Sequence, residues 1–290
     1  MKVKMYKAFA LSVLLLTMYH QICGMEDGLI SLSGDNGMVY GKKTVLKEFE
    51  VGTKMGGVVT RIFCLDSKQQ INAIDLNGIA NVAFYQVGSD EEESVLIKTE
   101  ENSIDQLQVA IIDTHTLSIG QKSNDFIQPS KGILYCIALK NIHHISCAGS
   151  IKMLSLTSIR TDELWLTLQG KSKFIADGPY GIDTNLLGAT LRNTASVSLS
   201  GKARHQKLYV YDSAEYDAQA LETNTVSVEA GGASKIKVSM VDLSAGVNTL
   251  DISGIYGSMT ELSLLEYEGT PLTRVKCKDS SLLKQIIQEK

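Results

Sequence analysis

Apolar and polar residues alternate along much of this chain. The segments 164–168, 226–230 and 236–240 each carry Leu, Val, Ile, Ala or Met at every second position, with mostly polar residues between them. Alternate positions of a β-strand fall on one face, so each segment predicts a strand with one apolar face. Helical periodicity has one good case, the apolar residues of 282–287 after an Asp279-Ser280 cap. We therefore predict an all-β fold that ends in a short amphipathic helix over 276–290.

A short corner motif recurs between the predicted strands. A strand ends in Gly, Asn or Ser, and a small residue and a spacer follow before apolar character returns, as in the segments 76–82, 191–197 and 230–236. At three such corners, Ala195, Ala214 and Ala233 are each 19 residues apart. A fixed period near 20 residues, carried by strands, is typical of a β-solenoid, whose rungs bury their apolar faces only by stacking.

Stacking makes a specific prediction about these corners. Gly or Asn tolerates unusual φ angles, and a small side chain fits where successive coils crowd together. We therefore expect Ala195, Ala214 and Ala233 to occupy equivalent positions on successive coils. A leucine-rich repeat is disfavoured because its LxxLxLxxN pattern is not sustained. An immunoglobulin-like sandwich would not require equal spacing of the corners.

The first 24 residues have the pattern of a secretory signal peptide. Three lysines lie within the first seven residues, an apolar run covers 8–18, and a polar break leads to Gly24. The run is shorter than the roughly 20 residues of a membrane-spanning helix, which disfavours a retained anchor. A lipoprotein is disfavoured because His20, Gln21 and Ile22 precede Cys23.

No second long apolar run follows the signal peptide, so we expect no transmembrane segment after its removal. We expect cleavage after Gly24 and export to the periplasm, the outer-membrane surface or the extracellular space.

Composition narrows the classes of partner. The chain has 28 basic and 32 acidic residues with the signs mixed, so it lacks the basic clustering of a nucleic-acid-binding protein. Three Pro against 24 Gly suits short strands joined by tight turns. Four cysteines, Cys64, Cys136, Cys147 and Cys277, remain after the signal is removed. They allow three disulfide pairings, and buried single thiols fit the irregular spacing equally well.

The order of these motifs resembles the GIN domain, the head domain ascribed to bacterial autotransporter adhesins. The similarity runs from about Ile71 to about Thr273 and is carried by the segments 74–82, 95–102, 116–119, 231–234, 250–254 and 267–271. The corners at 194–196 and 213–215 lack the second Gly of that pattern, which leaves the register of individual coils open. The resemblance implies a right-handed parallel β-helix-like solenoid, which we place over 62–275. Residues 25–61 are Gly-rich and less regular, which predicts a leading β segment or cap.

Three motifs suggest chemistry but lack the partners that chemistry needs. His143 and His144 are neighbours, and neighbours on a strand point to opposite faces, so we expect no metal site there. The SxxK spacing of Ser281 and Lys284 has no SDN or KTG partner. The acidic run 90–93 is most simply a solvated turn. The sequence therefore predicts no catalytic residue, no metal site and no cofactor.

Polysaccharide cleavage is the enzymatic alternative, because it needs paired carboxylates and exposed aromatic rings. Most acidic residues of the repeats, such as Asp177, Asp183 and Glu229, are scattered along the chain. One local group stands out as a candidate contact surface: Tyr211, Asp212, Glu215, Tyr216 and Asp217. The simpler interpretation of these side chains is packing on the surface of a strand.

We predict an exported, non-enzymatic, adhesin-like protein that presents a rigid β face to an envelope or extracellular ligand, either a glycan or a protein. The alternative is a carbohydrate-active β-helix enzyme, a polysaccharide hydrolase or lyase. Convergence of Asp212, Glu215 and Asp217 in a cleft would favour the enzyme.

Overall fold

The computed structural model describes residues 47–51, 58–65, 69–121, 132–241 and 253–286. Nearly all regular structure in these ranges is β-strand, and the helices are two short turns, α2 (Glu101–Ile104) and the 3₁₀ turn η1 (Gly178–Tyr180). The prediction of an all-β protein is confirmed. The predicted signal peptide 1–24, and most of the segment 25–61, lie outside the described residues.

The chain divides into two compact units. Unit 1 consists of residues 1–72 and 79–141, and unit 2 of residues 73–78 and 142–290. Strand β3 (Ala73–Gln86) contributes residues to both units. No helix among the described residues is both long enough and apolar enough to span a bilayer.

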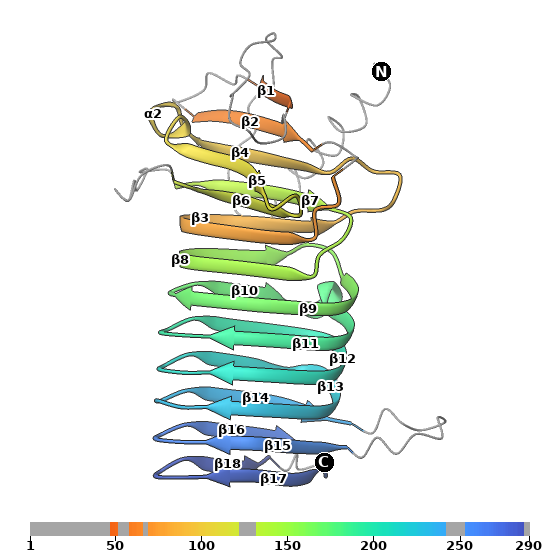
Figure 1. Cartoon of the computed structure of the whole chain (residues 1–290), viewed down its shortest axis with the longest axis vertical. Helices are drawn as coiled ribbons and strands as arrows, with labels where there is room; N and C mark the ends of the chain where they lie inside the picture. Colours follow the sequence, from red (N-terminus) through yellow and green to blue (C-terminus); the bar gives the residue numbers. More distant parts are fainter. Residues whose placement is uncertain (1–46, 52–57, 66–68, 122–131, 242–252, 287–290) are drawn as a thin grey trace. The chain divides into compact units, whose positions relative to one another are not determined.

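Unit 1 contains mainly antiparallel pairs (Figure 1). Its other strands are β1 (Lys47–Val51), β2 (Val58–Cys64), β4 (Ser94–Glu100), β5 (Leu107–Ile112), β6 (Thr116–Gln121) and β7 (Leu134–Leu139). The pairs β1–β2, β2–β4, β4–β7 and β5–β6 are antiparallel, whereas β3 runs parallel to β7. The prediction of parallel coils throughout 62–275 is therefore wrong for this unit. Its turn at Asp113–Thr114 has positive φ at both residues and lets β5 and β6 form a tight hairpin, which only antiparallel strands can do.

Unit 2 contains parallel strands (Figure 1). They are β8 (His144–Ser155), β9 (Ile159–Gly170), β10 (Lys173–Ala176), β11 (Ile182–Leu191), β12 (Ser196–Val210), β13 (Glu215–Ala230), β14 (Lys235–Met240), β15 (Gly254–Met259), β16 (Leu264–Glu268), β17 (Leu272–Cys277) and β18 (Leu282–Gln285). The register pairs them in two series. We call the series β9, β11, 201–210 of β12, 221–230 of β13, β15 and β17 the long ladder. The series β10, 196–199 of β12, 215–218 of β13, β14, β16 and β18 is the short ladder.

One long-ladder strand, a turn and one short-ladder strand make one coil. The core of unit 2 consists of apolar residues aligned on successive coils, and Leu166, Ala189, Leu208 and Val228 form one such line. Each of these four residues is at most 2 % exposed. Their spacings of 23, 19 and 20 residues show that the period is not constant.

The turn that connects the long to the short ladder has one residue with positive φ on every coil. These residues are Gly149, Gly170, Asn193, Asp212, Gly232, Glu261 and Asp279, with φ between 58° and 102°. Only Gly adopts this conformation without cost, and Asn and Asp follow it in preference. The prediction that corners need Gly or Asn is confirmed, and the structure adds Asp and Glu.

Asn and Asp at this position also accept hydrogen bonds from backbone N–H groups of the neighbouring coil. Asn193 accepts a hydrogen bond from the Gly170 N–H through Oδ1 at 3.2 Å, and Asp212 accepts from the Asn193 N–H through Oδ2 at 2.7 Å. Asp279 accepts from the Glu261 N–H in the same way at 3.4 Å. A side-chain oxygen on one coil thus pairs with a turn N–H that the ladders leave unpaired.

At six of these seven turns the second residue after the positive-φ position is small and buried, and after Gly149 it is the buried Ile151. The six small residues are Ser172, Ala195, Ala214, Ser234, Ser263 and Ser281 on successive coils, and each is at most 8 % exposed. Ala195 and Ala214 are therefore equivalent, as predicted, but their counterpart on the next coil is Ser234. Ala233 lies one residue earlier and is exposed. The second 19-residue interval was accidental, because the true spacing between these coils is 20 residues.

The predicted C-terminal helix is wrong. Residues 282–285 form strand β18, in which Leu282 and Leu283 pair with Leu264 and Leu265 of β16. The free parallel edge of β16 offers backbone hydrogen bonds, and this tertiary contact overrides the helical spacing of the apolar residues. Ser281 of the SxxK motif is the small turn residue of this coil, and its hydroxyl donates to the Lys278 carbonyl at 2.8 Å.

Two glycine substitutions can distinguish the destabilisation caused by steric crowding at the turn from that caused by backbone strain. Both Gly232 and Gly178 have positive φ, at 72° and 61°. A Cβ at Gly232 would lie 2.4 Å from the Asp212 carbonyl oxygen, whereas one at Gly178 would meet nothing within 4 Å. We expect Gly178→Ala to lower the free energy of unfolding by about 1–2 kcal/mol, the cost of a left-handed L-residue. Gly232→Ala should cost more, as measured by chemical denaturation. Equal losses would contradict close packing between successive turns.

Candidate contact surface

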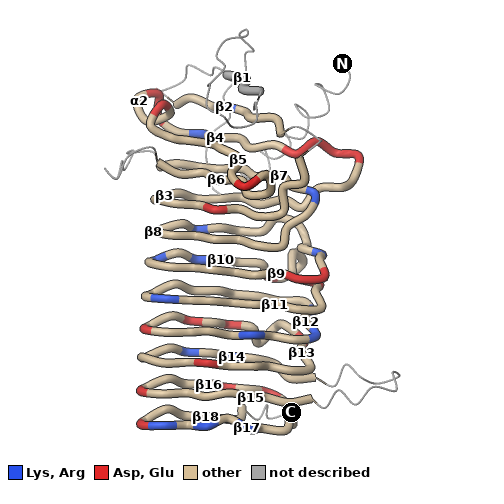
Figure 2. The backbone as a smooth tube through the Cα atoms, viewed as in Figure 1, with Lys and Arg blue, Asp and Glu red and all other residues tan. Residues whose placement is uncertain are grey.

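The outward side chains of the long ladder form an ordered surface. Residues paired in register project together, so each outward position repeats from coil to coil as a file. One file consists of Trp165, Gly188, Lys207, Ser227, Tyr256 and Arg274, and the next of Thr167, Thr190, Tyr209, Glu229, Ser258 and Lys276. Figure 2 shows acidic and basic residues interspersed along the strands of unit 2. The surface is therefore polar, of mixed charge, and interrupted by aromatic rings.

The predicted cluster does not form one surface. Tyr216 is 1 % exposed, so its prediction as a surface residue is wrong. It points into the core of unit 2, where its hydroxyl donates to Gln206 Oε1 at 2.7 Å, and burial raises its pKa. Alternation places Tyr216 inward between Glu215 and Asp217, which are both exposed on the short ladder.

Tyr211 is part of a contact across three coils. Its hydroxyl donates to Glu229 Oε1 at 2.7 Å, and the Arg192 guanidinium lies 5.2 Å from its ring centroid. Partial burial and the hydrogen bond to the Glu229 carboxylate raise the pKa of Tyr211 to about 12. The Tyr211 hydroxyl therefore stays protonated. The side chain joins neighbouring coils through a cation–π contact and a hydrogen bond.

The three carboxylates of the cluster have local partners. Asp212 accepts from the Asn193 N–H in the turn, and Asp217 accepts from the Gln219 N–H at 3.3 Å. Glu215 pairs with Lys235 at 3.3 Å, where exposure on both sides keeps the contribution small. Hydrogen bonds and an ion pair within the turns and strands therefore account for the positions of these three carboxylates.

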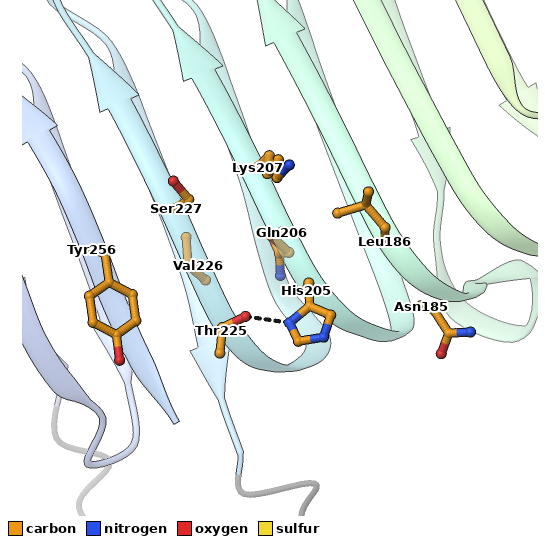
Figure 3. A pocket seen from close by; sticks show the side chains of 9 residues that line it. All are labelled: Asn185, Leu186, His205, Gln206, Lys207, Thr225, Val226, Ser227 and Tyr256. Carbon is orange, nitrogen blue, oxygen red and sulfur yellow. Dashed lines mark hydrogen bonds between the residues drawn. The ribbon is translucent and has the colours of Figure 1, made fainter. Parts of the chain in front are cut away.

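A shallow depression of about 460 Å³ lies on the surface of the long ladder, at a place the sequence did not indicate (Figure 3). Its lining comes from β11, β12, β13 and β15: Asn185, Leu186, His205, Gln206, Lys207, Thr225, Val226, Ser227 and Tyr256. We refer to this feature as the depression. None of Asp212, Glu215 and Asp217 lines it. These residues come from four strands and meet only through the register of those strands. The corner motif does not determine that register.

Two glycines fix the aromatic rings beside this surface. A Cβ at Gly188 would lie 2.0 Å from Trp165 Cε3, because the indole lies flat over this residue of the next coil. Similarly, a Cβ at Gly254 would lie 2.4 Å from the Tyr256 hydroxyl oxygen. The Tyr256 ring therefore lies back along its own strand, toward the register position of Thr225.

The two adjacent histidines have different surroundings. His143 is exposed at a bend before β8, and His144 begins the strand, where its Nε2 is hydrogen-bonded to Thr167 Oγ1 at 3.1 Å. Burial lowers the pKa of His144, so the ring stays neutral near pH 7. In the described ranges, no group of three or more His, Cys, Asp or Glu residues could hold a metal ion.

Cys64, Cys136, Cys147 and Cys277 are free thiols. Burial raises the pKa of Cys136 and of Cys147 to about 12, which keeps both protonated and unreactive.

The acidic run of unit 1 is only partly a solvated turn. Glu91 Oε2 accepts from the Gly88 N–H at 2.7 Å, as a turn residue would. Glu93 is 7 % exposed and accepts from the Lys140 N–H at 2.8 Å. Burial raises the pKa of Glu93. This carboxylate is therefore a buried structural group, contrary to the prediction.

The buried pair of Tyr216 and Gln206 can be tested by a double mutant. Gln206 replaces the aliphatic residues found in register on the neighbouring coils, Leu187 and Val226. Removing the hydroxyl with Tyr216→Phe leaves the buried amide unpaired, so we expect a loss of about 1–3 kcal/mol in the free energy of unfolding. Adding Gln206→Leu should restore most of that loss, measured by denaturation monitored by circular dichroism. A double mutant no more stable than Tyr216→Phe would refute this coupling.

Comparison with known proteins agrees with this architecture. Solved structures with similar folds include a putative adhesin from Bacteroides fragilis NCTC 9343, at 18% identity and a TM-score of 0.67, covering 80% of this chain and 98% of that one. A putative adhesin from Parabacteroides merdae ATCC 43184 has 15% identity and a TM-score of 0.60, with 80% and 97% covered. A putative lipid binding protein from Parabacteroides distasonis ATCC 8503 has 14% identity and a TM-score of 0.61, with 80% and 98% covered.

At these identities the likeness shows the fold alone, and no curated protein matches the sequence. The family model described as "Putative auto-transporter adhesin, head GIN domain" matches residues 71–249. Because this match spans more than half of the 290 residues, the chain belongs to this GIN-domain family.

Proposed function

We propose that this protein is an exported, non-enzymatic adhesin-like head that binds an envelope or extracellular ligand, a glycan or a protein, through the long ladder. The observation that carries the proposal is the alignment of outward side chains into files on successive coils. Such files repeat polar and aromatic groups at intervals of about 4.8 Å, the spacing of neighbouring strands. Many weak contacts at fixed spacing suit adhesion, where multivalency supplies the strength that single contacts lack.

We also propose that the coils of unit 2 wind as a right-handed parallel β-helix-like solenoid within a GIN-like region over 62–275. Two observations support this: parallel pairing in both ladders, and a turn of one conformation on every coil. Crossovers between parallel strands of one sheet are nearly always right-handed. A solenoid holds its outward side chains on a stiff backbone, as a multivalent surface requires.

The binding role is tested with a panel of envelope glycans and matrix proteins, assayed for both retention and breakdown. We expect retention of at least one ligand, with no release of new reducing ends or unsaturated sugars. Replacing Asp212, Glu215 and Asp217 together by Asn or Gln should leave retention unchanged, since these acids have local structural partners. Breakdown that disappears in this triple variant would replace the adhesin with a polysaccharide-cleaving enzyme.

Export is tested by the N-terminus of the natural product. The basic residues, apolar run and Gly24 of the leading segment support removal of residues 1–24. Mass spectrometry of protein recovered from the periplasm, outer-membrane surface or medium should show a chain that starts at or near Met25. Recovery of only an intact Met1 form from the cytoplasm would contradict export.

A further inference from the structure

The depression is a concavity on the surface of the long ladder. Asn185 and Leu186 come from β11, and His205 and Lys207 from β12. Thr225 and Ser227 come from β13 and Tyr256 from β15, while Gln206 and Val226 are buried beneath (Figure 3). The depression therefore spans four successive coils. Its volume of about 460 Å³ is in the range of small-molecule sites.

One wall of the depression is an aromatic ring with a fixed orientation. Tyr256 is half-buried, and its ring lies back over Gly254, which pairs in register with Thr225. The absence of a Cβ at Gly254 is what makes this ring position accessible. Aromatic faces of this kind pack against the apolar C–H face of a sugar ring, and the tyrosine hydroxyl remains available to water or ligand.

The floor and the opposite wall offer hydrogen-bonding groups for hydroxyls. His205 Nδ1 and Thr225 Oγ1 are hydrogen-bonded to each other at 2.6 Å, which fixes both side chains (Figure 3). The pair still presents the second ring nitrogen of His205. Asn185 is held from behind, since its Nδ2 donates to Asp162 Oδ1 on the neighbouring coil at 3.2 Å. Its amide oxygen remains an acceptor toward the depression, and Ser227 adds a hydroxyl.

The charged side chain that lines the depression is positive. Lys207 is the sole Lys or Arg among the nine lining residues, and none of the nine is Asp or Glu. Lys207 is exposed, so its ammonium is solvated, and a carboxylate beside it gains a modest attraction. Lys207 lies in register between Gly188, which the Trp165 indole covers, and Ser227.

We infer that the depression binds an acidic sugar residue, a pyranose ring that carries a carboxylate. The ring stacks on Tyr256, its hydroxyls meet His205 and Ser227, and its carboxylate pairs with Lys207. Asn185 lies three strands from Tyr256, so the next sugar of a chain reaches it. This inference rests on the proposed adhesin role and names the ligand class and the site for it. Neighbouring sugars of a chain would extend along the files of the long ladder.

The ligand class is tested by isothermal titration of the full chain with three probes. Trigalacturonate presents ring and charge, its methyl ester presents the same rings without charge, and acetate presents a carboxylate without a ring. We expect trigalacturonate to bind about threefold more tightly than its ester, since Lys207 is exposed, and acetate not to bind measurably. Equal binding of acid and ester, or of acetate and trigalacturonate, would overturn the inference.

The site is tested by matched pairs of variants. Tyr256→Ala should weaken trigalacturonate binding at least tenfold, whereas Tyr209→Ala, which removes an exposed tyrosine of the same ladder outside the depression, should not. Lys207→Gln should abolish the preference for the acid over its ester, and Lys276→Gln should leave it intact. Circular dichroism checks that all four variants fold.

The outcomes separate this inference from the proposed function. Equal effects of Tyr256→Ala and Tyr209→Ala would refute the depression as the site while leaving a surface-binding role in place. Retention of a neutral glycan or a protein from the panel, with no binding of trigalacturonate, would refute the ligand class alone. Failure of every member of the panel to bind would refute the adhesin role itself.

Discussion

Unit 2 depends on the close approach of successive turns, where the long ladder passes into the short ladder. Each turn places one residue at positive φ and brings its backbone against the turn of the preceding coil. The approach limits this position to residues that tolerate the conformation, and it exposes a backbone N–H that needs an acceptor. Asn193, Asp212 and Asp279 meet both demands at once, because each tolerates the conformation and supplies the acceptor to the coil before it. The ladders on either side of the turn can remain in register only because this contact repeats.

The same constraint determines what reaches the surface. Fixed turns hold each strand in register, and register decides which side chains lie beside one another on the long ladder. Tyr211 joins Arg192 and Glu229 on the neighbouring coils, and the Tyr256 ring lies beside Thr225. These neighbours are far apart in sequence, so the surface is a product of the turns. Glycine has a second role outside the turns, because Gly188 and Gly254 leave room for aromatic rings to lie flat against the sheet.

Sequence could predict the strands and the corner chemistry of unit 2, because alternation and positive-φ residues are local properties. Register is harder to predict from sequence. Equal spacing predicts equivalent positions for Ala195, Ala214 and Ala233, but Ser234 occupies the third position, because the spacing of these turns varies between 18 and 29 residues. Tyr216 is predicted on the surface, although the parity of its own strand puts it inside. The predicted helix over 276–290 is wrong because residues 282–285 pair with the edge of β16 as a strand. The depression had no local signal, because its residues come from four strands and meet only through the register.

Trp165, the single tryptophan of the chain, lies over Gly188 of the next coil, and its indole N–H donates to Glu163. Its indole is therefore packed at the contact between β9 and β11. Separation of these two coils would expose the ring to water and shift its emission to longer wavelength. The fluorescence of Trp165 therefore reports on the contact between these two coils. During unfolding, the time at which its emission shifts is the time at which the two coils separate.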